Sequence, residues 1–191
     1  MKVGILGAGN VGGALGAKWQ AAGHEVRFGT REPGTSEAAI AHGDVLLLAT
    51  PFDAAEGLLR GASLAGKILL DATNPLLPGL AGLSVGLTAS GGERVAEWAA
   101  GARVVKIFNT TGANNMENPV YGGERASMFY CGDDAAAKKI AHQLAEEAGF
   151  EPVDAGPLSQ ARYLEPMAML WITMAMRYGY GREIAFRLMR R

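Results

Sequence analysis

Short apolar runs recur along the chain, and stretches with helical spacing separate them. The runs are continuously apolar rather than alternating, which is typical of strands covered on both faces of a parallel sheet. The expected strands are Val3–Leu6, Glu25–Gly29, Val45–Ala49, Ile68–Asp71, Val104–Phe108 and Met128–Cys131. The expected helices are Val11–Ala22, Asp53–Leu59, Glu93–Ala99 and Asp134–Ala148. This alternation predicts a Rossmann-type α/β fold with a doubly wound, mainly parallel sheet.

Signals at the helix ends agree with this pattern. Asp133 is expected to cap the start of the last of these helices, and Gly149 to follow its end. Ser90 followed by Glu93 predicts a capping box at the start of another helix.

Two segments depart from the alternation. Thr73–Gly92 is rich in Gly, Leu and Pro, and we expect a packed loop beside the functional site. From Pro157 onward we expect a long helical region, with a second short helix after Gly181. Residues 1–155 are therefore interpreted as a Rossmann domain. Residues 156–191 are interpreted as a small C-terminal helical extension that is not an independent domain.

The motif GAGNVG, residues 7–12, follows the first strand and opens a helix, as in dinucleotide-binding loops. Gly7 permits the tight turn, Gly9 lets a pyrophosphate approach the backbone, and Gly12 allows close packing of helix on strand. The unpaired N–H groups of the helix start would bind the phosphates. A glycine-rich turn without a ligand is the alternative.

The second expected strand is followed directly by Thr30 and Arg31, at the place where an NAD site would carry an acidic residue. A guanidinium matches phosphate oxygens, and a hydroxyl adds a donor. This predicts a site for the 2′-phosphate of NADP, although Glu32 follows directly. Ala8 brings no hydroxyl, so the phosphate would depend on Thr30 and Arg31. The alternative is that Arg31 is a solvated loop charge.

Three other expected strands end in polar or proline-containing turns. Ligands of open α/β sheets lie beyond these carboxyl ends. Asn74 and Asn109 are candidates to line a nicotinamide pocket, and ordinary turn chemistry is an equal alternative. The remaining candidates at these ends are Thr50, Pro51, Phe52 and Pro75.

Composition narrows the possible partners. The chain has 191 residues, 49% of them hydrophobic, and a formal net charge of −1, which fits one ordinary globular unit. A chain with this near-neutral charge has no excess of basic residues with which to bind nucleic acid or an anionic membrane. A single cysteine excludes disulfide frameworks and cysteine-rich zinc sites, and we expect no metal. No apolar run is long enough to span a bilayer, and the first strand leaves no room for a signal peptide, so we expect a cytoplasmic protein.

Candidate acids and bases are few. His24, His42 and His142 are interpreted as surface residues, and no catalytic side chain is identified. Lys106 interrupts an apolar strand, so it should reach a partner or the rim of the site, and a structural ion pair is favoured. Hydride exchange between nicotinamide and a flavin-like ring needs mainly stacking geometry, because the cofactors carry the reactivity.

Several segments together resemble a known family, most specifically DAGPLSQARYLEP at residues 154–166. The others are GAGNVG, GTR, ATPF, VVKIFNT and CGDD. They resemble the small NADP-dependent oxidoreductases typified by the coenzyme F-420 (F420)-dependent NADP reductase, and also the nucleotide domain of membrane ferric reductases. The resemblance implies a homodimer in which nicotinamide and deazaflavin rings stack. It also implies pyrophosphate binding by Asn10 and Val11 beside the three glycines, and a nicotinamide pocket edged by Pro51, Phe52, Asn74 and Pro75.

The leading hypothesis is therefore hydride transfer between NADP(H) and coenzyme F-420 or a flavin as co-substrate. Reduction of a small imine or carbonyl is a second possibility, and a non-catalytic NADP(H) redox sensor is a third. The Met- and Trp-rich C-terminal segment is expected to form a pocket wall or a homodimer face.

Overall fold

The protein, described over residues 1–191 by a computed structural model, is built on one seven-stranded sheet. The strands, in their order across the sheet, are β2 (Glu25–Gly29), β1 (Lys2–Leu6), β3 (Val45–Leu48), β4 (Ile68–Asp71), β5 (Arg103–Lys106), β8 (Ser127–Gly132) and β9 (Glu151–Asp154). The first five are parallel, β8 is antiparallel to β5, and β9 is parallel to β8. The predicted α/β fold with a mainly parallel sheet is confirmed.

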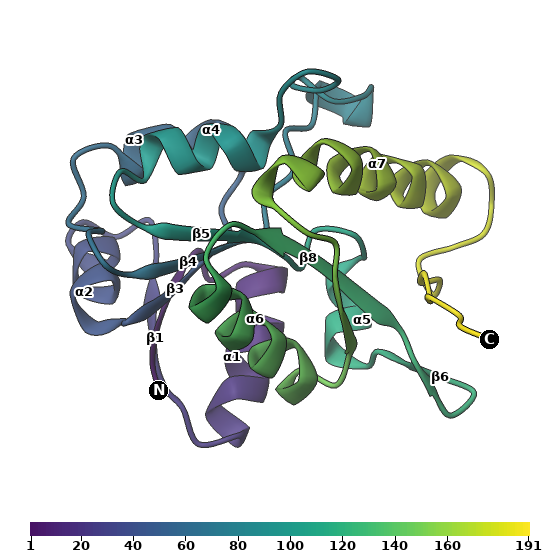
Figure 1. The fold of residues 1–191 in the computed structure, drawn as a ribbon, viewed down its shortest axis with the longest axis horizontal. Helices are drawn as coiled ribbons and strands as arrows, with labels where there is room; N and C mark the ends of the chain where they lie inside the picture. Colours follow the sequence, from purple (N-terminus) through teal and green to yellow (C-terminus); the bar gives the residue numbers. More distant parts are fainter.

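Helices cover both faces of the sheet (Figure 1). One face carries α1 (Asn10–Ala21) and α6 (Ala135–Glu147). The other carries α3 (Phe52–Leu59), α4 (Gly91–Trp98) and α7 (Ala161–Arg177). Residues of α2 (Thr35–His42) belong to the same core as α3, α4 and α7. None of these helices combines the length and the apolar content needed to cross a membrane.

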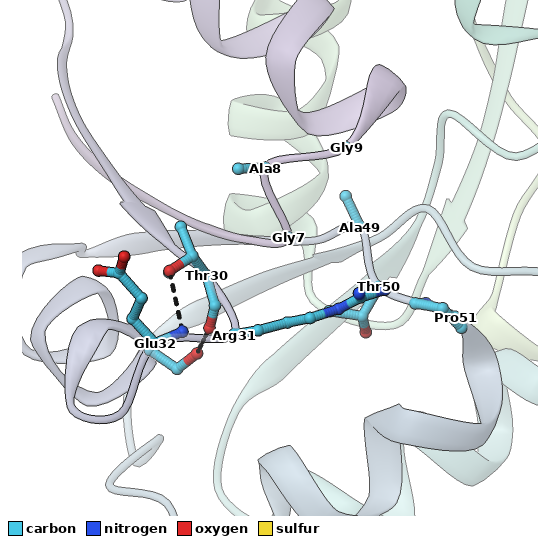
Figure 2. A pocket seen from close by; sticks show the side chains of 11 residues that line it. Gly7, Ala8, Gly9, Thr30, Arg31, Glu32, Ala49, Thr50 and Pro51 are labelled. Carbon is cyan, nitrogen blue, oxygen red and sulfur yellow. Dashed lines mark hydrogen bonds between the residues drawn. The ribbon is translucent and has the colours of Figure 1, made fainter.

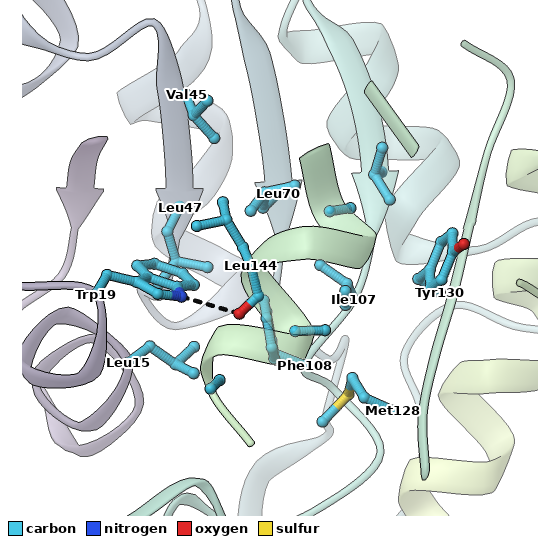
Figure 3. Close-up of a cluster of buried hydrophobic side chains, with 14 of the residues drawn as sticks. Leu15, Trp19, Val45, Leu47, Leu70, Ile107, Phe108, Met128, Tyr130 and Leu144 are labelled. Atoms are coloured by element: carbon cyan, nitrogen blue, oxygen red, sulfur yellow. Dashed lines mark hydrogen bonds between the residues drawn. The ribbon is translucent and has the colours of Figure 1, made fainter. Parts of the chain in front are cut away.

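Continuous apolarity in the strands has a direct structural cause. In β3, Val45 and Leu47 pack into the core beneath α1 and α6, whereas Leu46 and Leu48 pack into the core on the opposite face. Figure 3 shows the first core, where the indole of Trp19 donates a hydrogen bond to the carbonyl oxygen of Leu144 at 3.0 Å. Because each face has its own core, every position of β3 is buried and none is left for an alternating polar residue.

Several elements were missed by the pattern. They are α2, α5 (Ala113–Glu117), β9, the hairpin of β6 (Val120–Tyr121) and β7 (Glu124–Arg125), and the 3₁₀ turns η1 (Pro78–Leu80) and η2 (Leu158–Gln160). Each is short or carries few buried apolar residues, so its hydrophobic signal is weak. The strand expected to run to Phe108 ends at Lys106, and Phe108 has a positive φ of 62°.

The expected second helix after Gly181 is wrong. Residues 178–191 form an irregular tail that runs beside α5. The tail lacks the regular backbone hydrogen bonds of a helix and is held by side chains of other segments. The Ile184 carbonyl accepts from the side chains of Asn115 at 2.8 Å and Trp171 at 2.7 Å. Gly179 and Gly181 both have positive φ, which ends helical geometry after α7.

The capping expectations had mixed outcomes. Asp134 rather than Asp133 caps α6, accepting from the Ala137 N–H at 2.7 Å. The Asp133 carboxylate instead accepts from the backbone N–H of Leu158. Ser90 caps α4 as predicted, and Gly149 follows α6 with a φ of 93°.

Candidate functional site: a crevice at the carboxyl ends of β1, β2 and β3

A crevice lies where β1 and β3 run side by side and their connections lead to opposite faces of the sheet. Such a switch point opens a ligand crevice beyond the carboxyl ends of the strands. The pocket has a volume of about 710 Å³. It is lined by Gly7, Ala8, Gly9, Gly29, Thr30, Arg31, Glu32, Ser36, Ala49, Thr50 and Pro51 (Figure 2).

The glycine loop forms one wall of this pocket. Gly7 has a φ of 114°, and a Cβ there would lie 2.4 Å from the carbonyl oxygen of Ala49. A Cβ on Gly12 would lie 1.9 Å from the carbonyl oxygen of Gly7. Gly9 differs, because nothing lies within 4 Å of the place its Cβ would take. The loop is therefore closely packed against the protein at Gly7 and Gly12 and open toward the pocket at Gly9.

The start of α1 adds a local positive field. Gly9 occupies the N-cap position without a side chain to bond the first N–H groups, and the first turn carries no acidic residue. The N–H groups of Asn10, Val11 and Gly12 have no intrahelical partner. Together with the helix dipole, they form a site suited to a phosphate group.

The segment after β2 forms the opposite wall. Its backbone is closed by the hydroxyl of Thr35, which accepts from the Thr30 N–H at 2.9 Å and donates to the Glu32 carbonyl at 2.7 Å. Arg31 is exposed and makes no hydrogen bond or ion pair within the protein. In Figure 2 the Arg31 side chain extends in the direction of Thr50, whereas the Glu32 carboxylate points the other way. The guanidinium is therefore the free cation of this wall.

The end of β3 contributes a hydroxyl without a partner. Thr50 lines the pocket, and its Oγ1 is buried without a hydrogen-bond partner in the protein. A buried polar atom of this kind is rare unless a ligand or water satisfies it. Phe52, by contrast, does not line the pocket and packs on Trp98 with ring centroids 5.3 Å apart.

The two predicted asparagines lie together, and neither lines the pocket. The Asn74 side chain donates to the Asn109 carbonyl oxygen at 2.9 Å. The Asn109 side chain donates to Asn74 Oδ1 at 3.1 Å and to the Leu164 carbonyl oxygen at 3.2 Å. Asn109 is 3% exposed, and its Oδ1 has no partner. Phe108, the residue before Asn109, has a positive φ, so the chain turns sharply between β5 and Asn109.

The structure therefore separates the predicted residues into two sets. Gly7, Ala8, Gly9, Thr30, Arg31, Thr50 and Pro51 line the pocket. Asn10, Val11, Gly12, Phe52, Asn74, Pro75 and Asn109 do not line it. Four further lining residues were not predicted as site residues, namely Gly29, Glu32, Ser36 and Ala49. Ser36 belongs to α2, whose pattern was too weak to predict, and Ala49 is a small residue with no chemical signal.

Lys106 forms the predicted ion pair, and with two carboxylates rather than one. Its Nζ lies 2.9 Å from Asp71 Oδ2 and 2.9 Å from Glu165 Oε1, with all three side chains 0–1% exposed. Burial alone would lower the pKa of Lys106, but the charges of Asp71 and Glu165 outweigh this and raise its pKa. The ammonium is held charged inside the protein.

The histidines lie away from the crevice. His24, directly before β2, is a half-buried residue whose side chain is 7% exposed and lies 2.6 Å from Glu147, so it is less exposed than expected. His42 bonds the Glu25 carbonyl at 3.0 Å, again at the amino end of β2. His142, on α6, lies 3.3 Å from the Tyr130 hydroxyl. None of them lines the pocket.

A glycine loop that opens a helix at the switch point of a doubly wound sheet defines a Rossmann-type dinucleotide-binding protein. Residues 2–41 match the family described as NADP oxidoreductase, coenzyme F420-dependent. A solved structure from Arthrobacter sp. FB24, provisionally assigned as an F420-dependent NADP reductase, is 30% identical with a TM-score of 0.89, and each chain covers 100% of the other. The chain therefore belongs to the family of coenzyme F420-dependent NADP oxidoreductases.

Two further proteins are similar to this chain. The metalloreductase STEAP3 of Rattus norvegicus is 30% identical in an alignment 182 residues long that covers 88% of this chain. The chain spans 36% of the length of that relative. An imine reductase of Streptomyces aurantiacus is 21% identical with a TM-score of 0.66, covering 92% of this chain and 63% of the reductase. This last likeness concerns the fold.

Proposed function

We propose that the protein transfers hydride between NADP(H) and a deazaflavin, coenzyme F420, or a flavin-like acceptor. The observation that carries this proposal is the end-to-end match to the Arthrobacter protein, which leaves no part of either chain unaccounted for. In this proposal residues 1–155 bind NADP(H), and residues 156–191 complete the acceptor side without folding as a separate domain.

The crevice fits the adenosine and pyrophosphate parts of NADP(H). The open face of Gly9 leaves room for a phosphate to approach the backbone, and the start of α1 offers unpaired N–H groups. Arg31, free of any partner, and Thr30 would bind the 2′-phosphate on the other wall. Ser36 also lines this wall and would add a hydroxyl.

The nicotinamide half would extend from Thr50 toward Asn109. Both residues carry a buried oxygen atom without a partner, and a bound ligand would satisfy them. Pro51 lines the pocket between the two halves. Phe52 and Pro75 would act less directly, because both pack around Gly91 at the start of α4.

When bound, the cofactor supplies the hydride, and the chain supplies binding and orientation. Lys106, Asp71 and Glu165 lie on the segments next to Asn74 and Asn109, and all three are buried, with both carboxylates bonded to the Lys106 ammonium. Locked in this way, they are poorly suited to give a proton to a substrate. A planar acceptor ring needs alignment rather than such a donor, which favours a deazaflavin or flavin over an imine or carbonyl.

The test is a stopped-flow absorbance measurement of NADPH oxidation with coenzyme F420, FMN, FAD and a small cyclic imine as separate acceptors. We expect rapid oxidation by the deazaflavin or a flavin. The Gly9→Ala variant is expected to abolish the signal at low NADPH, whereas Gly13→Ala, one helical position outside the loop, should retain it. Oxidation by the imine alone would refute the proposal, and so would NADPH binding without oxidation by any of the four.

We also propose that the protein is a homodimer joined through α7. The helix exposes large apolar side chains, with Tyr163, Leu170 and Met176 exposed by 69%, 52% and 55%. Leu87, in the loop between β4 and α4, is 93% exposed. Apolar surface of this kind favours burial against a second copy.

A further inference from the structure

A buried polar cluster joins the segments that carry Asn74 and Asn109. At its centre the ammonium of Lys106 donates to Asp71 Oδ2 at 2.9 Å and to the Thr73 carbonyl at 2.6 Å, and it lies 2.9 Å from Glu165 Oε1. The three charged side chains come from β5, β4 and α7. We call Lys106, Asp71 and Glu165 the buried triad.

One arm of the triad leads to Asn74. Asp71 Oδ1 accepts from the Thr73 N–H at 2.9 Å and from the Thr73 hydroxyl at 2.7 Å. Lys106 bonds the Thr73 carbonyl from the other side. Because every polar group of Thr73 is held in this way, the backbone that leads into Asn74 is fixed.

The other arm leads to Asn109. The Glu165 carboxylate accepts from the N–H groups of Gly91 and Gly92, each at 2.8 Å, and so ties α7 to the start of α4. The residue before it, Leu164, offers its carbonyl to the Asn109 side chain. The position of Glu165 therefore sets the position of the Leu164 carbonyl.

These two arms determine which atom Asn109 presents to a ligand. Its amide nitrogen donates to Asn74 Oδ1 and to the Leu164 carbonyl, and the latter can only accept. Oδ1 is therefore the free atom, and it is buried without a partner. A hydrogen-bond donor of the ligand, such as the N–H of a carboxamide, fits this atom.

We propose that the buried triad is a positioning device for the nicotinamide half of the site, which holds Asn74 and Asn109 so that Asn109 Oδ1 receives the carboxamide of NADP(H). This inference rests on the proposed function. The triad acts through the asparagines and does not touch the ligand. It should have no influence on the adenosine half, which is bound by the glycine loop and by Arg31.

The competing view is that the triad only fastens α4 to α7. A second ion pair tests this, because Arg162 of α7 bonds Glu93 of α4 at 2.9 Å and 2.6 Å. It joins the same two helices, and neither residue contacts Asn74 or Asn109. Glu93→Gln is therefore a matched control for Glu165→Gln, since each replaces one carboxylate of a link between α4 and α7 by an amide of the same shape.

The experiment measures affinities by calorimetry for two probes, 2′,5′-ADP and NADPH. In Glu165→Gln an amide nitrogen must face the Gly91 N–H or the Lys106 ammonium, so the charge-assisted bonds are lost. We expect NADPH affinity to fall roughly tenfold to a hundredfold. Affinity for 2′,5′-ADP, which lacks the nicotinamide, should stay at the wild-type value. Glu93→Gln should leave both affinities unchanged.

Asp71→Asn is measured alongside, because it disturbs the same triad from β4 and is expected to give the same selective loss. Retained 2′,5′-ADP binding shows that a variant is folded. The inference is overturned if a folded triad variant binds NADPH as the wild type does, if both probes weaken equally, or if Glu93→Gln shows the same selective loss. Failure of 2′,5′-ADP to bind the wild-type protein would instead refute NADP binding itself, and the inference with it.

Discussion

Three glycines near the start of α1 allow ligand binding and folding to be separated experimentally. A methyl group at Gly9 or Gly13 would meet nothing within 4 Å. A methyl group at Gly12 would lie 1.9 Å from the Gly7 carbonyl oxygen and 3.0 Å from Ile5 Cγ2. The same chemical change, Gly→Ala, should therefore have a different effect at each of these three positions.

The magnitudes follow from these distances. Overpacking typically costs about 1–3 kcal/mol, and a clash with a backbone oxygen puts Gly12→Ala at the upper end. The better helix propensity of alanine offsets about 1 kcal/mol, which leaves a loss of roughly 2 kcal/mol, or about 4–8 °C in Tm for a chain of this size. Gly13→Ala has no clash and should gain about 0.5–1 kcal/mol. At the N-cap position of Gly9, poorer capping and lower unfolded-chain entropy should offset each other to within about 1 kcal/mol.

Thermal unfolding followed by circular dichroism without ligand, together with calorimetric titration of NADPH, measures both effects. Gly9→Ala is expected to keep its Tm and to bind NADPH at least roughly tenfold more weakly, a change of about 1.4 kcal/mol. Gly13→Ala should bind as the wild type does. Wild-type affinity for NADPH in Gly9→Ala would refute binding of the pyrophosphate against the backbone of Gly9. Wild-type stability in Gly12→Ala would refute the close packing of Gly12 against the Gly7 carbonyl oxygen.

Four further predictions address other parts of the molecule. Arg31→Asp should weaken NADPH binding roughly tenfold or more while NADH changes little, and an equal loss for both would exclude a role in binding the 2′-phosphate. A hydrogen bond from Arg162 lowers the pKa of Glu93 below its ordinary value of 4.5, so the pair stabilises the fold above that pH and loses its effect as pH falls through the lowered pKa. Glu93→Gln should therefore be less stable than the wild type by roughly 1 kcal/mol or less at neutral pH, and the difference in unfolding free energy should vanish in acid; a constant difference would contradict this. Burial raises the pKa of the Cys131 thiol to about 12, so iodoacetamide should label it only after unfolding, and rapid labelling of the native protein would count against this. Light scattering should find a dimer that Leu170→Glu converts to a monomer, and a wild-type monomer at micromolar concentration would refute the α7 interface.

Local patterns were sufficient for six of the seven strands of the sheet and for most of the residues that line the crevice. The central strands are buried on both faces, so each is a continuous apolar run. The elements that were missed lack this signal: β9 reads EPVD, with only Val153 buried, and Pro152 is tolerated because the strand lies at the edge of the sheet. In α2 only Ala39 and Ile40 are buried. Ser36, at its start, was therefore missed as a lining residue.

The proposed nicotinamide half was predictable only as a set of candidate residues. Lys106 stands out in the sequence because a lysine interrupts an apolar strand, and an ion pair was the correct expectation. Its partner Glu165 lies far along the chain, in the segment 154–166 that carries the family resemblance most specifically but gives no sign of a contact with Lys106. No spacing rule connects the two, since the contact depends on how α7 crosses the carboxyl end of the sheet.

The two halves of the site therefore differ in how the sequence encodes them. The proposed adenosine half depends on short contiguous segments, so Thr30 and Arg31 should be able to change without disturbing the rest of the fold. The nicotinamide half depends on β4, β5, α4 and α7 meeting at one buried ammonium. Removing Lys106 from that cluster would leave two buried carboxylates without a cation, which is strongly destabilising. Within this fold, cofactor preference should therefore be easy to alter, whereas the geometry presented to the hydride acceptor should change only when several of these segments change together.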